Sequence, residues 1–310
     1  MTHALTLDPA GAEYQAATDA LLEQVAQQRA AGTFDPANEA VLAELVERFA
    51  DKRGMKRLRL AETLGEIGDP AVGVLSQGLA HHANPMVRRA AAKTLALIAN
   101  PASIPVLVQA LLGDGDTVVH GSCAGALTQM GRASAPVLLE LLEREELPET
   151  TKGHVSWALA FLGEAAKEDF YGARNSASPA VRAAVVAAIA KVAQENPEPR
   201  DFEVLVEALG DDVEDVRLEA ASVLGILAHR PAVPNLLKML EQDVPASRKA
   251  AALALMKIGD RSALEPLNAA LAQEENMALE QVMQLAITQL SGQGATVVSV
   301  EADDWGEENW

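Results

Sequence analysis

The chain has 310 residues, of which 49% are hydrophobic but only 3% aromatic, and its formal net charge is −19. Such an acidic balance argues against binding to a phosphate backbone, and a single cysteine excludes an internal disulfide and is typical of a reducing compartment. No apolar run approaches the roughly 20 residues of a membrane-spanning helix, and the N-terminus lacks the features of a signal peptide. We therefore expect a soluble, cytoplasmic protein that binds neither nucleic acid nor membrane.

The first 50 residues precede a series of repeats. Residues 12–31 show helical spacing of apolar residues, and residues 36–50 supply the outer helix of the first repeat. The terminal units of a stacked array must cover its exposed end. We therefore predict that residues 1–50 form capping helices, including that first outer helix.

Residues 51–291 contain the repeats. Their first, fifth, ninth and twelfth positions are mostly apolar, which predicts one buried stripe on a helix. Several of these helices end in glycine, and a second apolar helix follows that often opens with proline. The pattern predicts an all-α fold, a right-handed α-solenoid of about eight helical hairpins. The eight aligned segments begin, 30 to 35 residues apart, at Lys56, Val87, Val119, Thr151, Val181, Val216, Ser247 and Leu279.

The last segment, residues 292–310, is an acidic tail. It contains five carboxylates and no basic residue, which argues against a further helical repeat. The composition is typical of a disordered tail. Trp305 and Trp310 favour the other interpretation, in which the tail docks into a groove.

The repeat itself resembles a known family. The segments VRRAAAKTLALIANPASIPVLVQAL and VRLEAASVLGILAHRPAVPNLLKML resemble the HEAT-like repeat of the phycobilisome-lyase family, over roughly residues 51–291. That family includes cyanobacterial lyase subunits that attach bilins to phycobiliproteins, relatives involved in phycobilisome degradation, and HEAT-like proteins that only bind partners. No lyase-specific catalytic signature can be carried over residue by residue, so the resemblance implies the fold more firmly than the function.

The fourth repeat carries an aromatic cluster on the face expected to meet solvent. Positions four, seven and eleven of each inner helix lie away from the buried stripe, and in solenoids the inner helices line the concave face. The cluster either fills space left by small neighbours or forms a binding hot spot, in which tryptophan is enriched. The predicted binding surface comprises His154, Trp157, Phe161, Ser122, Gly125, Ala184 and Ala187.

A group of basic residues stands out in this acidic chain. It is interpreted either as a solvated charged face or as an anchor for acidic groups on a partner or for ligand carboxylates. The second position of the repeats is also nearly always basic, which indicates an anion track or bridges to carboxylates of neighbouring repeats. The predicted basic anchor comprises Lys52, Arg53, Lys56, Arg57, Arg59, Arg88, Arg89 and Lys93.

The sequence is compatible with two functions. No nucleophile–base pair, phosphate loop or metal-ligand spacing is present, and Cys123 is interpreted as a small core residue. We therefore favour a non-enzymatic interaction protein, without cofactor, that grips a partner protein connected with phycobilisomes. The alternative is a phycobilin lyase or bilin-binding chaperone acting on phycobiliproteins. In that case Trp157 and Phe161 would stack on the phycobilin, basic residues would hold its propionates, and Glu62 or Glu66 would pair with its pyrrole nitrogens.

Overall fold

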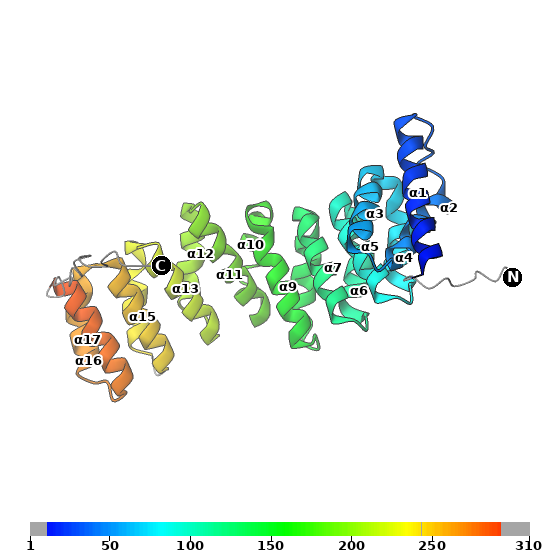
Figure 1. The fold of residues 1–310 in the computed structure, drawn as a ribbon. Helices are drawn as coiled ribbons and strands as arrows, with labels where there is room; N and C mark the ends of the chain where they lie inside the picture. Colours follow the sequence, from blue (N-terminus) through cyan, green and yellow to red (C-terminus); the bar gives the residue numbers. More distant parts are fainter. Residues whose placement is uncertain (1–10, 243, 293–310) are drawn as a thin grey trace, which may run out of the picture. The chain divides into compact units, whose positions relative to one another are not determined.

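The computed structural model describes residues 11–242 and 244–292 of the chain, which divides into two compact units, residues 1–188 and 189–310. Throughout the described ranges the secondary structure is helical, with no strand (Figure 1). The predicted all-α fold of stacked helical hairpins is confirmed. Within these ranges no helix is both long and apolar enough to cross a membrane.

In the first unit the helices form two layers. The inner layer contains α3, α5, α7 and α9, each in contact with the next, and α2, α4 and α6 pack against one another in the outer layer. The leading helix α1 lies against α3. The bounds are α1 Ala12–Ala30, α2 Glu39–Glu47, α3 Gly54–Ile67, α4 Val72–His81, α5 Pro85–Ile98, α6 Ile104–Gly113, α7 Thr117–Gln129, α8 Ala135–Leu142, α9 Glu149–Leu162 and α10 Lys167–Ala173; the division between the units falls within α11, Pro179–Glu195.

The second unit repeats the same two-layer arrangement. Here α13 contacts α15, α15 contacts α17, and α14 contacts α16. Gly225 allows the close approach of α13 and α15, because a Cβ at this position would lie 2.8 Å from the Cα of Ala254. The bounds are α12 Pro199–Ala208, α13 Glu214–Ile226, α14 Val233–Leu240, α15 Pro245–Ile258, α16 Leu264–Leu271 and α17 Met277–Ser291.

The apolar stripe of the repeats forms the core between the two layers. The ninth position supplies Leu64, Leu95, Leu127 and Leu159, all fully or almost fully buried. Each inner helix therefore has one face fixed by packing, which orients the opposite face toward solvent. The acidic tail lies outside the described residues beyond Gly292, so the predicted docking of Trp305 and Trp310 stays a prediction.

The inner helices end where the sequence places glycine. Gly68, Gly131, Gly163 and Gly259 all adopt positive φ angles, between 54° and 76°. This backbone region favours glycine because a side chain there would crowd the following carbonyl. Ala99 occupies the equivalent left-handed position after α5, with φ of 55° and ψ of 32°, and therefore carries backbone strain.

Candidate functional site

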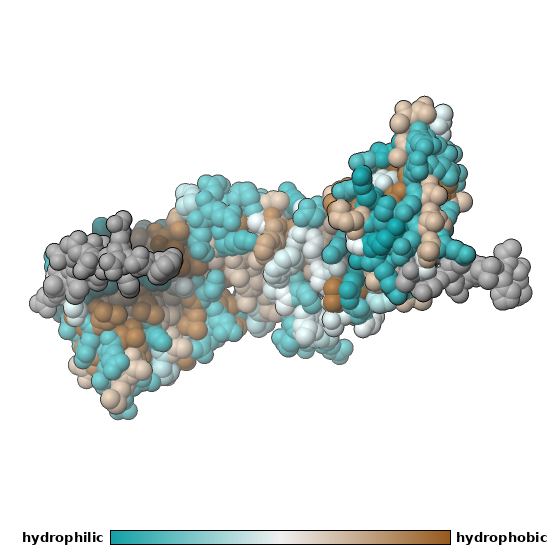
Figure 2. Space-filling model, viewed as in Figure 1, coloured by the Kyte–Doolittle hydropathy of each residue, from teal (hydrophilic) through white to brown (hydrophobic). Residues whose placement is uncertain are grey.

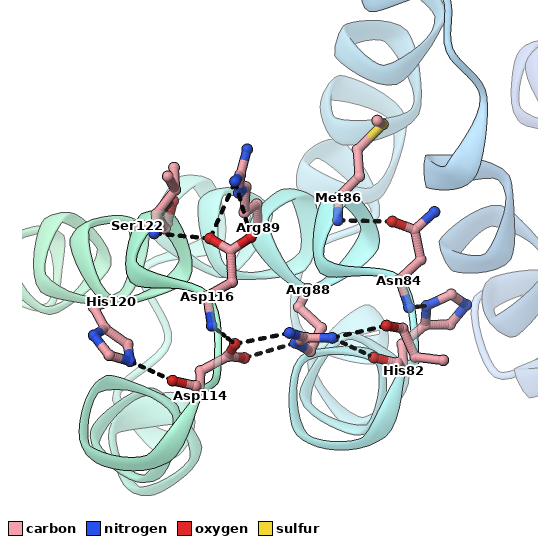
Figure 3. Close-up of polar contacts among 11 residues, drawn as sticks. His82, Asn84, Met86, Arg88, Arg89, Asp114, Asp116, His120 and Ser122 are labelled. Atoms are coloured by element: carbon pink, nitrogen blue, oxygen red, sulfur yellow. Dashed lines mark hydrogen bonds and ion pairs between the residues drawn. The ribbon is translucent and has the colours of Figure 1, made fainter.

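The basic residue at the second repeat position caps the helix that precedes it. In Figure 3, Arg88 on α5 donates from Nη1 to the carbonyl oxygens of His82 and Ala83, at 2.8 and 3.1 Å. These carbonyls follow α4 directly, at the end where a positive charge is favourable. The same contact, to a carbonyl six residues earlier, joins Arg57 to Asp51, His120 to Asp114, Arg182 to Ser176, Arg217 to Asp211 and Arg248 to Gln242.

Two of these arginines also form an ion pair with a carboxylate that precedes the next inner helix. Arg88 forms a bidentate pair with Asp114, with Nε and Nη2 at 2.6 and 2.8 Å from the carboxylate oxygens. Arg248 pairs with Glu274 in the same way, at 2.8 and 2.9 Å. Next to Arg88, Arg89 bonds to Asp116, at 3.0 Å (Figure 3). The hydrogen bond from Arg88 lowers the pKa of the Asp114 carboxyl below its ordinary value. Six of the second-position residues thus tie an inner helix to the end of the preceding helix and do not form an anion track, whereas Lys152 pairs with Glu149 within α9.

Most of the predicted basic anchor is used inside the fold. Arg53 pairs with Asp51 at 2.8 Å and with Asp19 at 3.0 Å, and Lys56 reaches Asp19 at 2.8 Å. These partners lower the pKa of Asp19. Together with the contacts of Arg57, Arg88 and Arg89, these pairs show that five of the eight predicted anchor residues hold the repeats together. Within the described residues, only the exposed Lys52, Arg59 and Lys93 make neither an ion pair nor a hydrogen bond to a carbonyl, so the anchor stays a prediction for these three.

The aromatic cluster lies on the solvent side of α9. Trp157 and Phe161 are 45% and 54% exposed, so neither fills the core. They are one helical turn apart, and their ring centroids lie 4.4 Å apart with the planes inclined by 34°. The two rings therefore form one contiguous aromatic surface. His154, one turn earlier on the same helix, is partly buried.

A shallow depression of about 380 Å³ lies between α5 and α7, next to this cluster. Its floor includes Gly121 and Gly125 of α7, with Lys93 of α5 at its edge. A Cβ at Gly125 would meet no atom within 4 Å, so this part of the floor is open. A Cβ at Gly121 would lie 3.8 Å from Nε2 of His154, which connects the depression to α9. In Figure 2 the surface over α7 and α9 is mostly pale with hydrophobic spots, whereas α1 to α3 show a mixture of hydrophilic and moderately hydrophobic residues.

The remaining residues of the predicted binding surface differ in how exposed they are. Ser122 lines the depression, and its hydroxyl donates to the Val118 carbonyl at 2.8 Å. Ala187 is partly exposed, but Ala184 is only 4% exposed, so its assignment to the binding surface is wrong. The reason is that buried residues surround most of the circumference of α11, and a helix apolar on nearly all sides is packed on nearly all sides.

Cys123 is fully buried on α7, as predicted for a small core residue. Burial raises the pKa of its thiol to about 12. Because the thiolate is the reactive form, this side chain is unsuited to nucleophilic chemistry. The described part of the chain also contains no group of three or more histidine, cysteine or carboxylate side chains placed to hold a metal ion.

Comparison with known proteins shows the family to which the chain belongs. The family model for HEAT repeats matches residues 39–128, 135–225 and 202–287. The chain also matches the bilin biosynthesis protein MpeU of Synechococcus sp. (strain WH8020), with 33% identity over 249 residues, 80% of this chain and 84% of that protein. The chain therefore belongs to the HEAT-repeat proteins of the phycobilisome-lyase type, as its repeats indicate.

Two solved structures are similar in fold. The complex of CpcE and CpcF of phycocyanin lyase from Nostoc sp. PCC7120 contains a chain with 24% identity and a TM-score of 0.42, covering 50% of this chain and 98% of that one. Kap121p has 13% identity and a TM-score of 0.45, covering 81% of this chain and 37% of that one.

The preference for a non-enzymatic interaction protein is wrong in the light of the MpeU match. A relative that aligns with four fifths of the chain is a bilin biosynthesis protein, which favours the alternative function of a bilin lyase or bilin-binding chaperone. The sequence argument failed because stacked repeats and a missing catalytic signature are common to binding proteins and enzymes built on this fold.

Proposed function

We propose that this chain is a bilin lyase or bilin-binding chaperone that holds an open-chain tetrapyrrole on the inner face of α5, α7 and α9. The observation that carries the proposal is the exposed Trp157–Phe161 pair beside a floor that has no side chain at Gly125. The bilin biosynthesis protein that aligns with most of the chain supports the same class of ligand. The partner is a protein, a phycobiliprotein, to which the bilin is passed.

The seventh repeat position sets the dimensions of the site. It is occupied by Lys93, Gly125 and Trp157 on three successive inner helices. The axes of packed helices lie about 8–10 Å apart, so the axes of α5 and α9, which carry Lys93 and Trp157, are about 16–20 Å apart. A flat, elongated molecule of four linked rings fits this span, with one end on the aromatic pair and the other near the lysine.

The side chains provide complementary chemistry for such a ligand. Aromatic faces stack on a conjugated ring system, and the exposed ammonium of Lys93 attracts a propionate. Of the two carboxylates expected at the pyrrole nitrogens, Glu66 is already paired with Arg29. Glu62, exposed at the seventh position of α3, lies one helix beyond Lys93 and therefore outside the proposed span, so neither carboxylate is assigned that role.

The buried thiol supports non-covalent handling of the bilin. Cys123 is the chain's only cysteine, and its burial and raised pKa make it a poor acceptor for a covalent bond to the ligand. The bilin is therefore a substrate that the chain orients and passes on, and the covalent acceptor lies on the partner protein.

Titration with biliverdin, followed by visible absorption, tests the proposal. A red-shifted and sharpened band is expected with the wild type. Trp157→Ala should weaken binding by about 2 kcal/mol, or roughly 30-fold. It should cost well under the roughly 3–5 kcal/mol of a buried tryptophan in stability, because the ring is about half exposed. An unchanged biliverdin spectrum with the wild type would contradict the proposal.

A second variant tests the floor without removing any contact. Gly125→Leu fills the open space in the middle of the site and should abolish binding, while stability rises by up to about 1 kcal/mol because leucine favours a helix over glycine. Gly73→Leu on α4 is the matched control, since Gly73 is also helical with nothing within 4 Å of its Cβ position. Equal biliverdin affinity of the two variants would show that the floor is not the binding site.

A further inference from the structure

His154 has two ring nitrogens in different surroundings. Its Nδ1 is buried and has no hydrogen-bond partner among the residues that the structure describes. Its Nε2 points toward the glycine floor, 3.8 Å from where a Cβ of Gly121 would be. His154 therefore presents one nitrogen to the protein interior and the other toward Gly121 of α7, a residue that also lines the depression.

This asymmetry determines the position of the proton in the neutral ring. Neutral imidazole carries one N–H donor and one bare acceptor nitrogen. A proton on Nδ1 would be a buried donor without an acceptor, and orphaned buried N–H groups are rare because each costs the full desolvation of the donor. A proton on Nε2 lies where water or a ligand can accept it. The favoured tautomer is therefore Nε2–H.

Neighbouring groups on α7 leave this donor available. The ring of His120 lies edge-on to that of His154, with centroids 6.4 Å apart and an interplanar angle of 85°. His120 directs its own Nε2–H to the Asp114 carbonyl at 2.7 Å, and Ser122 directs its hydroxyl to the Val118 carbonyl. Neither contact satisfies His154, whose Nε2–H thus faces the floor without an acceptor from α7.

We propose that His154 donates its Nε2–H to an oxygen acceptor of the bound ligand, a carbonyl or carboxylate oxygen lying over Gly121. The inference rests on the proposed function and adds an orientation to it. Aromatic stacking on Trp157 holds the plane of the ligand but allows it to slide, since every part of a conjugated system has a face to stack. One directional hydrogen bond, a turn away from the indole, fixes which end of the ligand lies on α9.

The tautomer can be measured directly on the full chain. In a two-dimensional ¹H–¹⁵N spectrum of histidine-labelled protein, His154 should show a bare Nδ1 and a protonated Nε2, with the signals assigned by their loss in His154→Gln. Addition of biliverdin should shift the Nε2 signal and leave Nδ1 bare. A protonated Nδ1 before and after addition would overturn the inference.

Binding measurements separate the hydrogen bond from packing. His154→Leu should weaken biliverdin binding about five- to tenfold, the range of one hydrogen bond. His154→Gln, which can place an amide N–H near the former Nε2, should stay within about twofold of the wild type. The melting temperature of His154→Leu should not fall, because the buried nitrogen that it removes has no partner.

Biliverdin dimethyl ester identifies the acceptor. If His154→Leu weakens binding of the ester as much as that of the free acid, the acceptor is an uncharged carbonyl oxygen; if the effect disappears, the acceptor is an ionised propionate. Equal affinity of His154→Leu and wild type for both probes would overturn the inference, while a loss in Trp157→Ala would leave the proposed function standing. A wild type that binds neither probe would overturn both.

Discussion

Replacement of Arg88 by methionine should destabilise the chain at neutral pH, because Arg88 joins α4, α5 and the start of the next repeat. The substitution keeps most of the aliphatic stem but removes the bidentate pair with Asp114 and the bonds to the carbonyls of His82 and Ala83. It therefore affects a helix end and a contact between repeats together.

The magnitude follows from how far the pair is buried. The side chains of Arg88 and Asp114 are 16% and 5% exposed. Exposed pairs contribute about 0–1 kcal/mol, whereas removing one partner of a fully buried pair costs about 3–5 kcal/mol. The pair lies between these limits, so we expect Arg88→Met to lower the free energy of unfolding by about 2–3 kcal/mol. Arg132→Met is the control, because Arg132 is 65% exposed in its pair with Asp169, and should cost less than about 1 kcal/mol.

The effect should depend on pH with a definite sign. Because Arg88 lowers the pKa of Asp114 in the folded state, the pair stabilises the fold above the ordinary aspartate pKa of about 3.9. That contribution is lost as the pH falls through the lowered folded pKa. The difference between wild type and Arg88→Met should therefore be largest near pH 7 and narrow below about pH 4.

Urea unfolding followed by circular dichroism, at several pH values, measures both effects. A double-mutant cycle with Asp114→Asn isolates the pair, since the double variant should be more stable than the sum of the two single losses predicts. If Arg88→Met costs no more than Arg132→Met, or if its cost is constant from pH 7 to pH 3, the account of this contact is wrong.

Three further results are expected. Ala99→Gly should raise the free energy of unfolding in urea by about 0.5–1 kcal/mol, because it relieves a left-handed backbone strain of about 1–2 kcal/mol against an entropic cost of about 0.4–1 kcal/mol. Ala80→Gly within α4 is the control and should lower the free energy of unfolding by about 1 kcal/mol; a loss of stability in both variants would refute the strain at Ala99. His120→Ala should lower the free energy of unfolding by about 1 kcal/mol, because it leaves the Asp114 carbonyl without its side-chain donor. His120→Arg introduces the residue type found in most other repeats and should preserve the melting temperature. Equal melting temperatures of the two variants would refute the capping role of His120. Cys123 should resist a thiol reagent at pH 8 until the chain unfolds, because burial raises its pKa to about 12, and rapid labelling of the folded protein would contradict this.

Several local features were readable from the sequence because each depends on a short stretch of chain. The apolar spacing that places Leu64 and Leu95 in the core is a property of one helix, and so is the choice of glycine at Gly68 and Gly259, where the backbone turns with positive φ. The same spacing predicted that Trp157 would lie away from the core, and it is 45% exposed. Repetition of these local rules was sufficient to predict an all-α stack of hairpins.

The roles of the charged residues depended on tertiary structure. Arg53 and Arg88 were predicted as part of an anchor for a partner, but folding brings Asp19 and Asp114 within hydrogen-bond distance, across 34 and 26 residues of sequence. Because an arginine side chain is long and the charged partner can come from any neighbouring repeat, the pattern along the chain does not decide between a solvent-facing cation and an internal bridge.

By itself, the sequence determined the repeat, the helical layers and the helix that carries the aromatic pair, since these follow from residue spacing within single helices. Only the tertiary structure decided that Ala184 is buried, that Gly125 opens onto empty space, and that the two nitrogens of His154 differ. The physical reason is that burial and hydrogen-bond satisfaction are set by atoms on neighbouring helices, about 8–10 Å away in space but some 30 residues away in the chain.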